Sequence, residues 1–166
     1  HAQAFPSFGS ERTGAPVVAY CRLDDREIRL REPILEPDAL IIQDPTLLHQ
    51  VDVFAGLKPD GLVLINTSRS LESLGLAEFA ETHPKVRLVT VPGSEIALKH
   101  VGRPLPNAAL LGGFAALSGL ITVESVAKAI REKFPAKIAE ANAKAAAAAH
   151  DHVGASAGKD AHAQAD

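Results

Sequence analysis

The chain has 166 residues, a hydrophobic content of 46% and a formal net charge of -3. This length and composition favour one globular domain with its own hydrophobic core. The mixed charges offer no basic stripe for nucleic acid, and no apolar run approaches the roughly 20 residues of a membrane span. We find no pattern of a secretory signal, so the expected location is the cytoplasm.

The sequence contains a single cysteine, Cys21, and no methionine. Cys21 lies in an apolar-rich run, where we expect a small buried side chain. One thiol cannot form an internal disulfide, and iron–sulfur clusters usually need four thiolates. The absence of methionine, even at the first position, predicts a fragment or a processed chain.

The N-terminal part predicts a loop followed by a hairpin. Frequent glycine and proline in residues 1–16 indicate an ordered loop. β-branched and aromatic residues at 17–23, and alternation at 27–30, predict two strands joined by a turn at 24–26.

Residues 39–91 then predict alternating strands and helices. The apolar runs at 39–43, 61–65 and 86–91 predict buried strands. Asp44 and Pro45 are suited to begin a helix that Gly56 ends, and Ser70 could cap a second helix to about Glu81. Unbroken apolar strands between helices favour an α/β fold with a parallel sheet.

Beyond Pro92 the sequence predicts helices throughout. The predicted helices are residues 95–101, residues 107–117 capped by Asn107, and a helix capped by Thr122 that Pro135 ends.

The C-terminal part changes in composition. Residues 136–150 are rich in alanine, which predicts a further helix. Residues 151–166 hold no apolar side chain larger than Val153, so we expect a disordered tail. The expected organisation is therefore a domain at 1–135, an alanine-rich helix at 136–150 and a tail at 151–166.

The known cofactor and nucleophile motifs are absent from the sequence. It has no G-x-G-x-x-G turn, no P-loop and no G-x-S-x-G elbow. Gly112 and Gly113 fall inside a predicted helix, where close helix packing explains them better than phosphate contact. His150, His152 and His162 fall in or next to the expected tail, so we assign them no metal.

The most unusual segment is the glycine- and proline-punctuated loop at residues 5–16. Arg12 and Glu11 lie between glycines there, just before a predicted core strand. The guanidinium could bind a phosphate, a carboxylate or a partner chain. It could equally contact Glu11 or the backbone and merely fix the loop, and physical reasoning alone leaves both interpretations open.

The same segment, AFPSFGSERTGAPV at residues 4–17, resembles the signature of the gamma subunit of pyruvate:ferredoxin oxidoreductase. Further matches follow in the same order as in that family: QDPTLL at 43–48, VDV at 51–53, GLKPDG at 56–61, INT at 65–67, IAL at 96–98, GRP at 102–104 and NAALLG at 107–112. The resemblance spans about residues 1–144. Relatives specific for 2-oxoglutarate or indolepyruvate typically carry Arg-Gly-Gly near Thr13 and Gly14, so it favours pyruvate as the substrate.

The resemblance implies a Rossmann-like three-layer fold with helices on both faces of the sheet. Family members usually begin with a strand and a glycine-rich turn that precede the position of His1, and both are expected to be missing here. Thr13 stands where many relatives carry arginine, which leaves Arg12 to act alone. The candidate contacts with substrate, coenzyme A (CoA) or another subunit are Ser10, Glu11, Arg12 and Gly14.

The family's chemistry is shared among subunits. Such enzymes decarboxylate pyruvate on thiamine diphosphate with Mg²⁺, pass electrons through iron–sulfur clusters to ferredoxin or flavodoxin, and release acetyl-CoA. The resemblance implies that those cofactors belong to partner subunits and that this chain alone has no catalytic residue and no activity. Two alternatives remain: a truncated nucleotide-binding dehydrogenase domain, based on strand and helix alternation alone, and a non-enzymatic interaction module.

Overall fold

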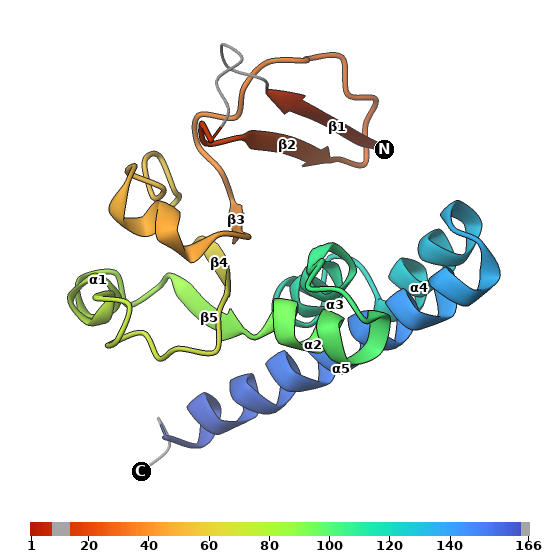
Figure 1. Ribbon diagram of the computed structural model, residues 1–166. Helices are drawn as coiled ribbons and strands as arrows, with labels where there is room; N and C mark the ends of the chain where they lie inside the picture. Colours follow the sequence, from red (N-terminus) through yellow and green to blue (C-terminus); the bar gives the residue numbers. More distant parts are fainter. Residues whose placement is uncertain (8–13, 164–166) are drawn as a thin grey trace.

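A computed structural model describes residues 1–7 and 14–163. Figure 1 shows a hairpin set apart from a small central sheet and from a group of helices that lie along the longest helix. The elements in chain order are β1 (Ala2–Ser7), β2 (Val18–Leu23), β3 (Ala39–Ile42), the short 3-10 helix η1 (Pro45–His49), β4 (Leu62–Asn66), α1 (Ala77–Thr82), β5 (Arg87–Val91), α2 (Gly93–Val101), α3 (Asn107–Ser118), α4 (Val123–Lys133) and α5 (Ala136–Ala163).

The central sheet is parallel and has the strand order β3–β4–β5. Leu62 of the middle strand lies opposite both Ala39 and Arg87. The core of β4 is fully buried, with 0% exposure at Val63, Leu64 and Ile65. A strand buried on both faces reads as a continuous apolar run, so the predicted parallel sheet is confirmed.

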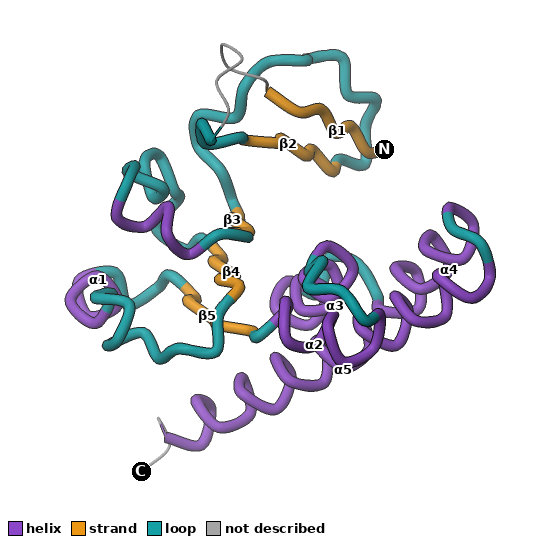
Figure 2. The backbone as a smooth tube through the Cα atoms, in the orientation of Figure 1, coloured by secondary structure: helices purple, strands orange, loops and turns teal. Residues whose placement is uncertain are grey.

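Both faces of the middle strand β4 are covered, and Figure 2 shows helices on its two sides. Leu64 and Val91 face α3 and α5, in a cluster with Ala109, Leu110, Leu117, Ala145, Ala149 and Val153. Val63 and Ile65 face the opposite way, towards η1 and α1, in a cluster with Ile42, Leu74, Leu76 and Val86 that Phe54 and Phe79 complete. The predicted mixed α/β class is therefore confirmed, on a sheet of three strands.

The helices on the η1 and α1 face are shorter than predicted. Asp44 caps η1 by accepting a hydrogen bond from Thr46 N, as expected, but this 3-10 helix ends at His49. Ser70 accepts a bond from Ser73 N within a turn, and Gly75, with a φ of +75°, interrupts the chain before α1. This face is consequently covered by turns and single helical turns.

The helices on the opposite face follow the prediction closely. Thr122 caps α4 by accepting a bond from Ser125 N, as expected. Asn107 is the first residue of α3, and Pro106 occupies the cap position instead. Proline is well suited to a helix start because it has no N–H to satisfy.

Helices α3 and α5 pack through glycine and alanine. A Cβ built on Gly112 would overlap the carbonyl group of Ala146 in α5. A Cβ on Gly113 would lie 3.3 Å from Leu64 Cδ2 and 3.4 Å from Val153 Cγ2. The absence of side chains at these two positions lets the two backbones approach closely, as the sequence analysis expected of Gly112 and Gly113.

The disordered tail predicted from Asp151 onward is wrong over the described residues, because α5 continues to Ala163. Val153 is completely buried, one turn beyond the buried Ala149, and joins the cluster beneath β4. The prediction failed because it assumed that a segment with only small apolar side chains cannot pack. Gly112 and Gly113 bring α3 so close to α5 that alanine and valine are large enough to fill the space between the two helices.

The N-terminal prediction is correct for the strand at 17–23, which is β2, and wrong for its partner. Residues 1–7 do not form a loop: β1 pairs antiparallel with β2, Ala2 opposite Leu23 and Ser7 opposite Val18. The segment at 27–30, predicted as the second strand, is irregular. Pro6 is tolerated because a two-stranded hairpin consists of edge strands only. Cys21, expected to be buried, is exposed on this hairpin.

Candidate functional site

An open cleft of about 380 Å³ lies at the carboxyl ends of the three parallel strands. Its walls are residues at the end of each strand or directly after it, together with the first turn of α2: Gln43, Asp44, Pro45, Asn66, Thr67, Ser68, Pro92, Ser94 and Glu95. In α/β sheets, ligands bind outside the carboxyl ends of the strands. This cleft is therefore the first candidate site, and no sequence motif predicted it.

Asn66, the last residue of β4, holds this cleft together. Its Nδ2 donates to the carbonyl oxygen of Gln43 and to Ser94 Oγ, each at 2.9 Å. Its Oδ1 accepts from Ser94 N at 3.1 Å. The Asn66 side chain is only 9% exposed, and it ties the ends of β3 and β4 to the first turn of α2.

The cleft presents carboxylates and hydroxyls to the solvent. Asp44 accepts hydrogen bonds from Thr46 Oγ1 at 2.7 Å and Thr46 N at 2.9 Å, and these bonds hold the pKa of Asp44 below its usual value. Glu95 adds a second exposed carboxylate beside Ser94. Two carboxylates disfavour an anion, whereas hydroxyl and amide groups of a ligand can pair with them and with the hydroxyls.

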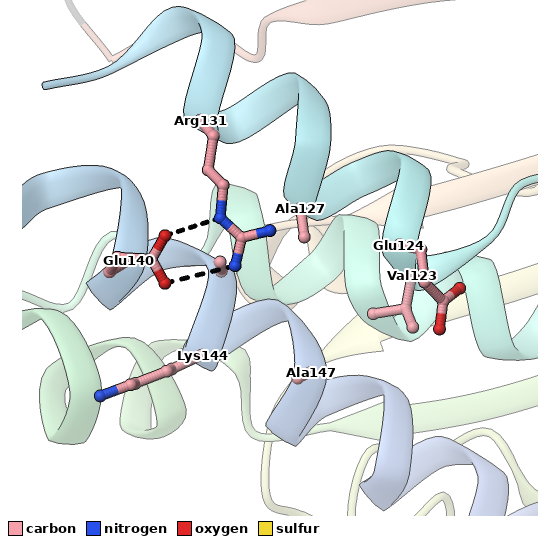
Figure 3. Close-up of a pocket in the computed structure, with 8 residues that line it drawn as sticks. Val123, Glu124, Ala127, Arg131, Glu140, Lys144 and Ala147 are labelled. Atoms are coloured by element: carbon pink, nitrogen blue, oxygen red, sulfur yellow. Dashed lines mark hydrogen bonds and ion pairs between the residues drawn. The ribbon is translucent and has the colours of Figure 1, made fainter. Parts of the chain in front are cut away.

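A second open groove, of about 330 Å³, runs between α4 and α5 (Figure 3). Ala127, Ala143 and Ala147 are among its lining residues, and Arg131 reaches across from α4 to Glu140 of α5. Arg131 Nε and Nη2 donate to the two carboxylate oxygens at 2.6 and 3.2 Å. The hydrogen bonds from Arg131 lower the pKa of Glu140, so this ion pair fastens the two helices to each other.

The site residues predicted from the sequence belong to the hairpin. Ser10, Glu11 and Arg12 lie outside the described residues, between β1 and β2. Gly14 is exposed and has a φ of +87°, a left-handed conformation that favours glycine. Of these candidates the structure describes Gly14 alone, and the cleft is formed by other segments of the chain.

The side chains considered for metal binding are dispersed. Across residues 1–7 and 14–163, no three His, Cys, Asp or Glu side chains gather closely enough to hold a metal ion. His150 lies on α5, with its Nδ1 3.5 Å from an oxygen of Asp151. Among the same residues, no helix combines the length and apolar character that crossing a membrane would require.

The family model for pyruvate ferredoxin/flavodoxin oxidoreductase matches residues 1–152. The common gamma subunit of pyruvate/ketoisovalerate oxidoreductases of Pyrococcus abyssi is 47% identical over 146 residues, which cover 88% of this chain and 77% of the relative. Pyruvate synthase subunit PorC of Methanocaldococcus jannaschii is 46% identical over 151 residues, covering 91% of this chain and 79% of that protein.

Solved structures agree with these sequence relatives. The pyruvate oxidoreductase subunit PORC of Thermotoga maritima is similar with a TM-score of 0.73 and 30% identity, over 91% of this chain and 79% of that one. A keto/oxoacid ferredoxin oxidoreductase gamma subunit of Geobacter sulfurreducens shares the fold, with a TM-score of 0.66 at 20% identity over 92% and 79% of the two chains.

Fold and cleft together define a mixed α/β protein with a polar opening at the carboxyl edge of a parallel sheet. The chain belongs to the pyruvate ferredoxin/flavodoxin oxidoreductase family, as a gamma-type subunit. The resemblance found in the segment around Arg12 is thereby confirmed at the level of the family.

Proposed function

We propose that the chain supports the CoA-dependent oxidative decarboxylation of pyruvate to acetyl-CoA and CO₂, with ferredoxin or flavodoxin as the electron acceptor, in a cytoplasmic enzyme of several subunits. The observation that carries this proposal is the family match over residues 1–152, with relatives named for pyruvate at 41–47% identity. Pyruvate, or a close small 2-oxoacid, is the substrate that those names support.

The chain's own side chains do not fit the family's redox cofactors. An iron–sulfur cluster usually takes four thiolates, and this sequence has only Cys21. Decarboxylation of a 2-oxoacid needs the electron sink of a thiamine ylid. We therefore assign thiamine diphosphate, Mg²⁺ and the clusters to partner subunits, and give this chain the task of supporting their assembly.

The hairpin loop is the proposed contact with CoA or with a partner subunit. Arg12 has a planar fork of donors that suits phosphate and carboxylate groups, and Ser10 and Glu11 lie beside it in the sequence. Gly14 provides the left-handed residue from which the chain enters β2. The pairing of Ser7 with Val18 brings the two ends of this loop together.

The Rossmann-like completion of the sheet is also a proposal. β3 pairs with β4 on one side, and over the described residues no strand pairs with its other side. The side chain of Ile41 in β3 lies on the same sheet face as Leu64 and is 38% exposed, although parallel sheets normally have both faces covered by helices. We place a further strand along this edge, and amide exchange as slow in β3 as in β4 of the assembled enzyme would support it.

Reconstitution tests the proposed function. Thiamine-binding and cluster-bearing partner subunits are combined with and without this chain, and CoA-dependent pyruvate oxidation is followed by ferredoxin reduction. We expect the chain alone to be inactive, and its omission to reduce both activity and complex yield. Full activity in a stable complex without it would refute the proposal. Purification of the chain without thiamine-binding and cluster-bearing subunits would favour an interaction module.

A further inference from the structure

The hairpin has one apolar face that nothing in the described chain covers. Side chains alternate between the faces of a strand, and the β1–β2 register therefore places six of them together. All six are apolar and exposed: Ala2, Ala4, Pro6, Ala19, Cys21 and Leu23. We call these six residues the outer face of the hairpin.

The inner face is different because the chain covers it with its own residues. Phe5 and Tyr20 lie against each other with ring centroids 5.5 Å apart, and the Arg31 guanidinium lies 5.7 Å from the centre of the Phe5 ring. Tyr20 and Phe5 are half-buried, as are Gln3 and Arg22 beside them. The segment that follows β2 thus packs on one side of the hairpin only.

The hairpin also stands apart from the rest of the fold. β1 and β2 make extensive contacts only with each other, and Figure 1 shows the chain leaving them for β3 as a single connecting segment. An isolated two-stranded hairpin is marginally stable in water. A bare apolar face on such an element is a candidate interaction surface.

We propose that the outer face docks on another subunit of the oxidoreductase, a partner with an apolar patch of its own; this inference rests on the proposed function. Exposed apolar residues continue from the outer face through Ala15, Pro16 and Val17, where Val17 is 64% exposed. The hairpin therefore presents one apolar surface that covers described residues of both strands and of the segment before β2.

The size of the outer face favours a partner subunit over a second copy of this chain. Strand rise and spacing give the face an area of about 200 Å². A stable interface buries about 800 Å² on each partner. Two copies that met through this face would bury too little area, whereas a partner subunit that also contacts Ala15, Pro16, Val17 and other surfaces of the chain can reach it.

Cys21 makes the test direct because it is the sole cysteine and lies on the outer face. N-ethylmaleimide is added to the full chain alone and to the reconstituted complex, and modification is followed by mass spectrometry. We expect modification in the complex to be slower by about tenfold or more, since a covered thiol is inaccessible. Equal rates would overturn the docking surface.

Substitutions provide an independent arm. Ala4→Asp and Ala19→Asp place a charge on the outer face, and Ala77→Asp is the matched control, because Ala77 is an exposed alanine at the start of α1. Recovery of partner subunits should fall by about tenfold for the first two variants and remain unchanged for the control. Equal recovery for all three would contradict the proposal, as would a dimer of the isolated chain that protects Cys21.

The two levels of the proposal fail in different ways. If the chain recovers no thiamine-binding or cluster-bearing subunit, the proposed function fails and the docking surface with it. If these subunits are recovered and Cys21 reacts as fast as in the isolated chain, only the docking surface fails.

Discussion

At the scale of single residues, the glycines of α3 determine how closely the helices pack. Gly112 faces the backbone of Ala146, so even a methyl group there has no space. Gly154, on the outside of α5, has no atom within 4 Å of the position of a Cβ. The two glycines therefore allow the same substitution to be tested in opposite environments.

We predict that Gly112→Ala lowers the free energy of unfolding by about 1–3 kcal/mol, because α3 and α5 must separate to admit the methyl group. Gly154→Ala should instead raise it by about 0.5–1 kcal/mol, since alanine restricts the unfolded chain and favours a helix. Urea denaturation of both variants measures the two effects. Similar changes in both would mean that the α3–α5 approach is not tight.

The ion pair between Arg131 and Glu140 predicts a pH dependence. Because the folded-state pKa of Glu140 is lowered from 4.5, its stabilisation is present above that value and is lost as the pH falls through the folded pKa. Glu140→Gln should therefore reduce the urea midpoint near pH 7, and should differ less from the parent chain near about pH 3.

The control for this prediction is Glu132→Gln, because the Glu132 carboxylate lies 4.0 Å from Lys128 on the surface of α4 alone and joins no second helix. The same pH-dependent loss in both variants would show that the contact between α4 and α5 is not its cause.

At the scale of elements, α5 is the part of the fold whose extent the sequence least revealed. Its buried face consists of Ala139, Ala143, Ala145, Ala146, Ala149 and Val153. Such small side chains gave no recognisable apolar stripe, and their role depends on the glycines of α3, which are remote in sequence. The buried strands of the central sheet, by contrast, were visible locally as continuous apolar runs.

Ending the chain after His150 should lower the free energy of unfolding by about 2 kcal/mol or more, because it removes Val153 from beneath β4. Val153→Ala should cause a smaller loss in the same direction. A chain that ends after Ser156 retains Val153 and serves as the control. The measurement is the melting temperature of each of these three proteins relative to the parent chain. An unchanged melting temperature for the shortest chain would contradict the buried position of Val153.

The candidate sites were predictable to different degrees. Arg12 and its neighbours were visible as a motif, because glycine and proline punctuate the segment. The cleft at the strand ends was missed, although its signal lay in the sequence: a polar residue follows each of two predicted strands, Asp44 the first and Asn66 the second. The hydrogen bonds of Asn66 to Gln43 and Ser94 depend on the parallel order of the strands, which no local pattern reveals.

At the scale of the whole molecule, the chain has a hairpin and a body, formed by the central sheet and the helices, which one segment joins, as Figure 1 shows. The proposed contact residues belong to the hairpin, whereas the stability of the body depends on α5. Substitutions in the hairpin loop should therefore affect the assembled enzyme and leave the fold of the body intact.

Arg12→Lys tests this separation. The variant keeps the charge but loses the planar fork, so we expect weaker CoA affinity or a lower yield of the complex, with an unchanged melting temperature. Arg29→Lys is the control, because Arg29 is an exposed arginine that forms an ion pair with Glu27 in its own segment. Normal acetyl-CoA formation and normal CoA affinity in Arg12→Lys would refute the assigned role.

The position of α5 has a consequence for how the protein forms in the cell. α5 supplies members of two of the buried clusters, one beneath the sheet and one against α3 and α4. Among the described elements it is also the last to leave the ribosome. Domains generally fold as units during synthesis, and these two clusters cannot close until α5 has emerged. Until then α3 exposes its apolar surface, and this interval is when the nascent chain most needs protection from aggregation.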